Sequence, residues 1–309
     1  SKEILIESGQ LGNFTGDQLR QIGLAKVTAE GLTEVADLYG LPPRVLVGKF
    51  RPAENWKPVR IRIEDFVSPL LKEYVCRHVK ESLEHGKNFF IFEIDSYGGV
   101  AHSGMELAQF IRDMKGVKTV AYVPEKAISA AAFIALGCDE MILHREAKLG
   151  DCGLLFIEGG EFHYAPEKQV SILKADLRVL AQAKAYPPAL AEGMVDKDMV
   201  VHEVRDKRTG SVTYASEQEI SDAPPDTLEK LRMVKGKGEF LTMTGTQALE
   251  LKFSQDLVDN FDGLRAIYGL ENTDIAMVTP NWVDTFVWVL NLPIISVLLI
   301  VFGLLGLYL

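Results

Sequence analysis

Ser129 and the glycine pair Gly98-Gly99 are the residues whose types and positions could do chemistry. Ser129 stands at the head of a predicted helix, after the apolar run VKTVAYV and the turn PEKAI. The glycine pair follows another apolar run, FFIFEI. A serine hydroxyl can attack a carbonyl carbon, and nearby backbone N–H groups can stabilise the oxyanion that forms. Because serine is also a favoured helix N-cap, its position alone does not make it a nucleophile.

A serine nucleophile needs a base that takes its proton. Of the 6 histidines, His102 lies near the glycine pair and His163 near a later loop, and neither belongs to a motif. A lysine that burial keeps neutral can also accept the proton. Lys168 is the candidate, because it opens an amphipathic helix predicted from about Glu167 to Ala183, where its charge gains nothing from the helix dipole. A surface lysine in a salt bridge would show the same spacing.

These groups must be positioned by the stretch Phe89 to Gly153. In it, short apolar runs lead into turns and then into helical patterns, which predicts parallel βαβ units. A third run, EMILHREAKLGDCG, repeats the step from strand to loop. Functional groups of such units collect at the carboxyl ends of the strands. The pattern therefore predicts an α/β fold with the serine and the glycines at one edge of a sheet.

The composition excludes several classes of protein. With 309 residues, 25% charged and 47% hydrophobic, the chain is globular and long enough for one large domain and additional segments. A net charge of −10 argues against nucleic acid as a partner. The 3 cysteines have no metal-like spacing and are odd in number, so we expect neither a metal site nor a disulfide framework. Nothing in the sequence indicates another cofactor.

The last residues form a long apolar run. No charged residue occurs from Thr285 to Leu309, and Trp282 and Trp288 lie near its start, where an interfacial aromatic belt would be. The run exceeds the roughly 20 apolar residues that a membrane-spanning helix needs. We expect 283–309 to be the first transmembrane helix of a membrane region that continues past the end of this chain. A buried core helix is the alternative.

The chain also contains an internal repeat. Phe14–Leu41 aligns with Met243–Leu270 at a constant offset of 229 positions, and a TG-Q pattern and a YGL triplet recur in both. The simplest explanation is that 1–55 is the tail of an upstream copy of the same domain, repeating about 240–282. A small helical module used twice is the alternative. A new domain is expected from 57 to 280.

Four blocks of the sequence resemble a known family. The segments IDSYGG, AISAAAFIALGCDEMIL, KLGDCG and APEKQVSILKADLRVLA look like the membrane-bound serine proteases of the NfeD type. These belong to the Clp-protease and signal-peptide-peptidase-A group within the crotonase-like superfamily. The similarity covers roughly Lys57 to Leu309. It implies a crotonase/Clp-protease-like core of repeated ββα units in a protease domain at 57–280, followed by the C-terminal transmembrane helix.

The resemblance also implies a Ser-Lys dyad. Ser129 in Ser-Ala-Ala matches the Ser-Ala-Gly-like stretch of the family's nucleophile. Lys168 matches the lysine that opens the helix after a hairpin-like loop and acts as the base. Lys174 is the weaker match, because the residues after Lys168 fit the family pattern.

The oxyanion hole follows from the same resemblance. Gly98-Gly99 matches the turn whose backbone N–H helps to form it, and the Ala130 N–H is the second donor. Two departures from the family pattern affect the site: Ala131 replaces the usual glycine, and Ser96-Tyr97 replaces Thr-Pro. Neither departure removes a catalytic group.

By this resemblance we expect a membrane-anchored serine endopeptidase that cleaves apolar segments of membrane-associated proteins. Its partners would be a polypeptide substrate, the membrane, a stomatin-like protein and further copies of itself. A bacterial-type plasma membrane is the expected location, with the protease domain outside the cytoplasm if a signal peptide precedes it. A membrane scaffold without useful proteolysis is the second hypothesis. A crotonase-type acyl-CoA enzyme is disfavoured by the serine–lysine pairing and the apolar tail.

Overall fold

The computed structural model describes residues 14–28, 34, 38, 56–159, 161–280 and 282–308. It divides into two compact units, Ser1–Gly48 and Lys49–Leu309. In the first unit, the short helix α1 (Gly16–Gln21) is capped by the side chain of Thr15. The second unit holds the main sheet and the candidate site.

The main sheet is built around the long strand β2. Its parallel strands are β1 (Pro58–Val67), β2 (Phe89–Gly99), β3 (Lys118–Val123), β5 (Glu140–Leu143), β4 (Lys126–Ile128) and β6 (Lys148–Gly150). The first half of β2 pairs with β3, whereas Ser96 near its end pairs with Ala127 of β4. Because β1 pairs along the whole of β2, β3 and β4 share its other edge: β3 and then β5 follow from the first half of β2, and β4 and then β6 follow from its end.

Helices connect these strands in the predicted alternation. They are α3 (Pro69–Glu84), α4 (Ala101–Arg112), α5 (Ala130–Leu136) and α6 (Glu167–Ala183). The order strand, strand, helix occurs as β3, β4 and α5. The α/β fold predicted from the sequence is therefore confirmed, and α6 has the predicted bounds.

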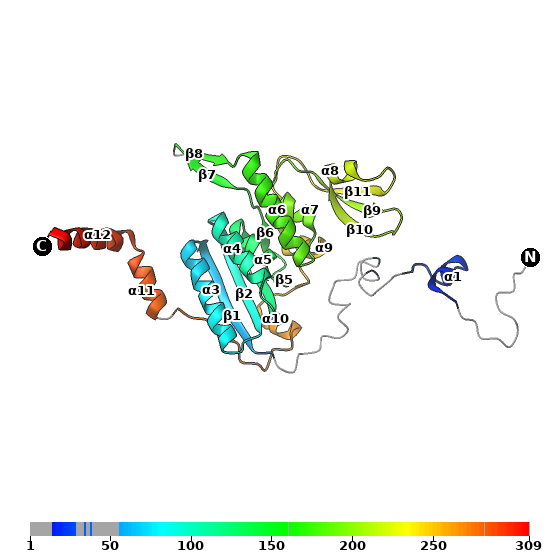
Figure 1. Cartoon of the computed structure of the whole chain (residues 1–309). Helices are drawn as coiled ribbons and strands as arrows, with labels where there is room; N and C mark the ends of the chain where they lie inside the picture. The colour runs from blue at the N-terminus through cyan, green and yellow to red at the C-terminus, as the bar shows by residue number, and fades with distance from the viewer. Residues whose placement is uncertain are drawn as a thin grey trace, which may run out of the picture. The chain divides into compact units, whose positions relative to one another are not determined.

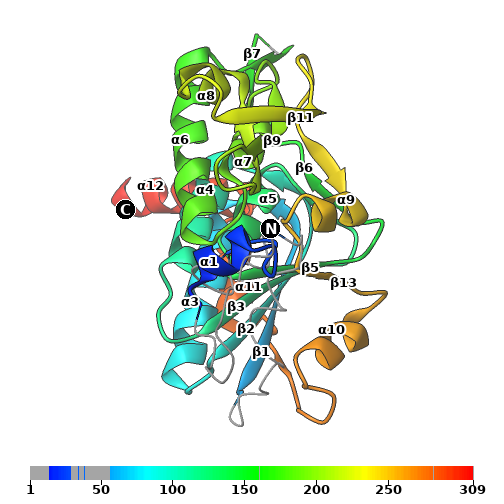
Figure 2. The ribbon, with the colours of Figure 1, turned by 90° about the vertical axis from the view of Figure 1, so that its right-hand side faces the viewer.

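The two faces of the sheet are covered by different helices. On β2, Phe90 and Phe92 are fully buried in the core that includes side chains of α3, α4 and α5. Phe89 and Ile91 point to the other face and are buried against α10 (Phe261–Ile267) and the segment after it. Figure 2 shows α3 and α10 on opposite sides of the strands. The continuous apolar run FFIFEI is thus explained, because a strand covered on both faces needs apolar residues at successive positions.

The rest of the unit follows in chain order. A hairpin of β7 (Leu155–Glu158) and β8 (Glu161–Tyr164) leads into α6, near the upper edge of Figure 1. After α7 (Pro188–Gly193), an antiparallel sheet forms from β9 (Val201–Asp206), β10 (Val212–Ser216) and β11 (Leu228–Lys235), with α8 (Glu217–Asp222) between the last two. The elements β12 (Thr242–Thr244), α9 (Gly245–Glu250), β13 (Asp256–Leu257) and β14 (Ala276–Met277) return to the main sheet.

The C-terminal run differs from the prediction of one transmembrane helix. It forms α11 (Trp282–Leu290) and α12 (Pro293–Tyr308), bent by 70° at the break between them. Among the described residues, no single helix has the length and apolarity to cross a bilayer, although this bent pair together meets both requirements. The break has a chemical cause: Pro293 lacks the backbone N–H that a continuing helix needs, whereas it is well tolerated at a helix start.

Polar contacts tie α11 to α3. The Asp284 carboxylate forms an ion pair with Arg77 and lies 3.1 Å from Nε2 of His78. The Asp284 side chain is only 7% exposed, so its charge depends on these partners. Burial and the neighbouring Arg77 charge lower the pKa of His78, which favours the neutral ring near neutral pH.

The packing of β2 leads to a stability prediction. Phe92→Ala removes a fully buried ring from the core, so we expect the free energy of unfolding to fall by about 3–5 kcal/mol. Phe66→Ala is the matched control, because Phe66 is 63% exposed and should cost well under half as much. Denaturant unfolding of both variants measures the difference. Equal losses would contradict the burial pattern of the sheet.

Candidate active site

Ser129 has an unusual backbone conformation. It stands between β4 and α5 with φ 54° and ψ −125°, in a region that residues with a Cβ rarely adopt. Its N–H donates to the Gly150 carbonyl at 3.0 Å, and its own carbonyl accepts from the Ala132 N–H at 2.9 Å. Such strain costs on the order of 1–3 kcal/mol and persists where surrounding contacts fix it, often at functional sites. A sharp turn from strand to helix that presents a serine is the geometry of a nucleophile.

Gly98 packs directly against this serine. Its φ of 96° suits glycine, and a Cβ added to it would lie 2.6 Å from the Ser129 Cβ and 3.0 Å from the Ala130 nitrogen. Only a glycine therefore fits here. The end of β2 and the start of α5 touch through backbone, as the predicted glycine turn requires. Ser129 itself is half-buried, and its hydroxyl oxygen accepts no cap bond from the N–H groups of α5.

The three residues predicted to form the oxyanion hole have different surroundings. The Gly98 N–H already donates to the Ser96 Oγ at 3.0 Å, and the Ser96 hydroxyl donates to a carbonyl of β1. Gly99 pairs with Val67 of β1 and leaves no room for a Cβ. The Ala130 N–H is the first of α5, so the helix itself offers it no acceptor. Of the three, the Ala130 N–H is therefore the one that the helix start leaves available to donate. Gly98 lacks a Cβ and so leaves room beside Ser129.

Lys168 is not joined to Ser129. It lies in the first turn of α6, just after the β7–β8 hairpin, and its side chain is exposed. Within the described part of the chain, no hydrogen bond or ion pair involves the Lys168 amine. The burial expected of a neutral lysine is missing because no described element covers this turn of α6. In this structure, the Lys168 amine and the Ser129 hydroxyl of the predicted dyad are therefore not hydrogen-bonded to each other.

The other candidate bases have partners of their own. Lys174 forms an ion pair with Asp196 at 2.7 Å. His102 is 81% exposed at its side chain and lies 3.3 Å from the Glu106 carboxylate. His163, on β8, lies beside the Phe156 ring, with centroids 5.9 Å apart.

An ion pair beside the glycine turn was missed by the sequence analysis. The Lys126 Nζ lies 2.6 Å from Asp95 Oδ1 and 4.7 Å from the centre of the Tyr97 ring. The hydrogen bond to Asp95 raises the pKa of Lys126, so this amine stays protonated and is no base. The only available signal was that both residues sit at strand ends next to the turns.

The Cys152 thiol binds the backbone of Ser129 and is not itself a reactive nucleophile. Its thiol is buried and donates to the Ser129 carbonyl at 3.6 Å. Burial raises the pKa of Cys152, so the reactive thiolate is suppressed. In the regions that the structure describes, no cluster of three or more His, Cys, Asp or Glu side chains could hold a metal ion.

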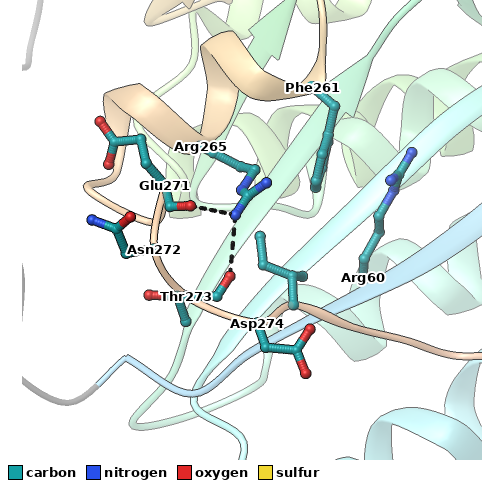
Figure 3. Close-up of a pocket in the computed structure, with 8 residues that line it drawn as sticks. Arg60, Phe261, Arg265, Glu271, Asn272, Thr273 and Asp274 are labelled. Carbon is teal, nitrogen blue, oxygen red and sulfur yellow. Dashed lines mark hydrogen bonds between the residues drawn. The ribbon is translucent and has the colours of Figure 1, made fainter.

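A separate hollow of about 430 Å³ lies near the amino end of β1, and Figure 3 shows its lining. Arg265 points into it but donates to the carbonyls of Glu271 and Thr273. Arg60 pairs with Glu93 and stacks on the Phe261 ring at 3.9 Å. Both guanidinium groups are therefore used to hold the loop after α10 and the sheet, and neither is left unpaired for an anionic ligand.

Two curated proteins match the chain in sequence. One is the membrane protein NfeD1b of Bacillus subtilis, 25% identical over 256 residues, which are 82% of this chain and 51% of that protein. The other is the membrane-bound protease PH1510 of Pyrococcus horikoshii, 22% identical over 220 residues, which are 67% of this chain and 49% of that protein. The chain spans about half the length of the curated relatives that it matches.

The solved structures that share the fold include two of one protein. Both are titled as 1510-N, a membrane-bound stomatin-specific protease. One is a serine-to-alanine mutant, with a TM-score of 0.52, 17% identity and coverage of 74% of this chain and 100% of that chain. The other is a lysine-to-alanine mutant in complex with a substrate peptide, with a TM-score of 0.54, 17% identity and coverage of 78% and 100%.

A family model described as NfeD1b, N-terminal domain, matches residues 58–226, more than half of the chain. The match begins at the first residue of β1 and includes Ser129, Lys168 and the six strands β1 to β6. The resemblance seen in the four sequence blocks is confirmed. The chain belongs to the NfeD1b N-terminal domain family.

Proposed function

We propose that this protein is a membrane-anchored serine endopeptidase in which Ser129 is the nucleophile and Lys168 the base. One observation carries the proposal: the strained backbone of Ser129, held between β4 and α5 and packed against Gly98. A serine that served only as a helix cap would have an extended backbone, and its hydroxyl oxygen would accept a bond from an N–H of the first turn, as in Thr15 and Ser216.

The proposed reaction uses these groups in turn. The Ser129 Oγ attacks the peptide carbonyl carbon while its proton passes to the neutral amine of Lys168. The N–H of Ala130 donates to the oxyanion, and the Gly99 N–H is the proposed second donor. The ammonium of Lys168 then protonates the leaving amine as the C–N bond breaks. In the second half, Lys168 takes a proton from the attacking water and returns it to the Ser129 Oγ as the acyl C–O bond breaks, which releases the acid and restores the neutral amine.

Lys168 must approach Ser129 for this reaction to run. Its helix begins right after the β7–β8 hairpin, whose strands pair with each other and with no other described strand. A rearrangement of this hairpin and the first turn of α6 would bring the amine to the serine, and a bound peptide would supply the missing cover. In support, a solved relative with a lysine-to-alanine mutation is in complex with a substrate peptide.

The substrate and partners are proposed by analogy with the relatives. The two solved relatives are titled stomatin-specific, so we infer a polypeptide substrate with apolar segments and a stomatin-like partner. Further copies of the chain are also proposed as partners. Apolar side chains that stay exposed on the hairpin and along α6 would suit such contacts, namely Leu155, Tyr164, Ile172 and Val179.

A membrane location is proposed because both curated relatives are named as membrane proteins. The apolar pair α11 and α12 would provide the anchor, with Asp284 holding α11 to α3. The side of the membrane on which the protease domain lies depends on whether a signal peptide precedes it.

A membrane scaffold that binds a stomatin-like protein without proteolysis is the second candidate. The exposed and unbonded amine of Lys168 favours it, since a base that never reaches Ser129 supports no turnover. Ala131, where the family has glycine, is fully buried in the core and does not decide between the two functions.

The nucleophile is tested with a fluorophosphonate probe. We expect labelling of the wild-type protein and its complete loss in both Ser129→Ala and Ser129→Gly. The glycine variant should also unfold at an equal or higher temperature than the alanine variant, because it relieves a strain of about 1–3 kcal/mol against a chain-entropy cost of about 0.5–1 kcal/mol. Wild-type protein that is folded by circular dichroism but unlabelled would favour the scaffold.

The base is tested by substitution of lysines with a cleavage assay on an apolar peptide. Lys168→Ala should lower kcat by about 10²–10⁴-fold, the usual contribution of a general base, and Lys168→Arg should be as inactive because arginine stays protonated. Lys115→Ala is the control, because this exposed lysine lies outside the site and should retain full activity. Activity that survives in Lys168→Ala but is lost in Lys174→Ala would move the role of base to Lys174.

A further inference from the structure

The internal repeat is also a repeat in three dimensions. We call residues 15–25 the first module and residues 244–254 the second module; they are related by the offset of 229 positions. Each begins with a capping box, Thr15 with Gln18 and Thr244 with Gln247. The φ and ψ angles of the two threonines are −73° and 161° against −74° and 164°. The helices α1 and α9 that follow are both 6 residues long.

The turns that end the two helices also agree. In the first module the N–H groups of Leu24 and Ala25 both donate to the Leu19 carbonyl, at 2.9 and 3.0 Å. In the second module the N–H groups of Phe253 and Ser254 donate to the Ala248 carbonyl, at 2.8 and 3.0 Å.

The residue before the two donating N–H groups has a positive φ in both modules: 75° at Gly23, before Leu24, and 64° at Lys252, before Phe253. Two segments with few identical residues thus share one backbone shape. The lysine adopts it despite the steric cost of a left-handed conformation.

The second module packs on a defined docking site in its domain, which we call its seat. Gly245 lies directly on the His144 carbonyl, and the Thr246 N–H donates to the Arg145 carbonyl at 3.1 Å, so the helix start sits on the turn between β5 and β6. The side chains of Ala248 and Phe253 are fully buried. The second module therefore closes the domain over the β5–β6 edge.

The first module has the shape of this closing element but not its burial. Leu24, at the position of Phe253, is 74% exposed, whereas Phe253 is 0% exposed. Leu19 stands at the position of Ala248 and carries three more carbon atoms, so it needs a roomier seat than the one that Ala248 fills. This chain's own β5–β6 edge is already covered by the second module. A second copy of this chain would have the same edge covered in the same way.

We propose that the first module is the closing element of a second domain of this fold, encoded upstream of it in the same polypeptide. It would dock on that domain's counterpart of the β5–β6 edge, with Leu24 buried where Phe253 is buried here. The Asp17 N–H corresponds to the Thr246 N–H and would donate to the turn carbonyl. The seat must also be wider opposite Leu19. The protein would then contain tandem domains of this type, whether or not Ser129 is catalytic.

Hydrogen exchange in two forms of the protein tests this proposal. The forms are the full-length natural polypeptide and the 309-residue chain. In the short chain, we expect the amides of Leu24 and Ala25 to exchange at least about 100-fold faster than those of Phe253 and Ser254, because the seat is absent. In the full-length polypeptide, Leu24 and Ala25 should slow by about 100-fold or more.

A matched pair of variants in the full-length polypeptide checks the buried position. Leu24→Asp should abolish the slow exchange of Ala25, because it puts a charge into the proposed seat. Gln21→Asp on the same helix should preserve it, since the equivalent Glu250 is exposed in the seated module. Equal exchange of Leu24 and Ala25 in the two forms would overturn the proposal. So would a natural polypeptide without a domain of this fold upstream of the first module.

Discussion

The close approach of α4, α5 and β2 around Ser129 is the constraint on which the candidate site depends. Backbone meets backbone there, with almost no side chain between the elements. A Cβ added at Gly104 of α4 would lie 2.7 Å from the Ala130 Cβ, and one added at Gly137 would lie 2.9 Å from the Ala108 Cα. Small residues on both helices therefore let α5 lie deep against α4. Only in that position does its first residue stand beside the glycine turn of β2.

The same packing explains how a strained serine persists. The backbone of Ser129 costs about 1–3 kcal/mol, whereas full burial of a large apolar side chain contributes about 1.5–3 kcal/mol. Three such side chains on α5, Phe133, Ile134 and Leu136, are almost completely buried. Their burial outweighs the strain and fixes where the helix begins. The sharp turn at Ser129 is thus a consequence of a helix that is held by the side chains along its length.

The central strands and the helix α6 could be predicted from the sequence, because local patterns of apolar and turn residues indicate them. The apolar runs of β2 and β3 and the bounds of α6 all reflect short-range periodicity and turn residues. The break at Pro293 could not be predicted from the uncharged run alone, since hydropathy does not report backbone hydrogen bonds. The position of Lys168 relative to Ser129 depends on how the β7–β8 hairpin, which lies between the two residues in the sequence, is arranged in space. No local pattern encodes that distance, and the resemblance to a family supplied only the residue's role.

Contacts of α3 link the apolar C-terminal helices to the neighbourhood of the site. Asp284 of α11 binds Arg77 and His78 in the second half of α3. The first turn of α3 is capped by Ser68, directly after β1. The end of β1 in turn accepts the hydroxyl of Ser96, which holds the Gly98 N–H. An unbroken series of polar contacts and one rigid helix therefore runs from α11 to the glycine turn. Contiguity of this kind allows α11 to fix the orientation of the glycine turn, and it does not by itself make α11 a switch.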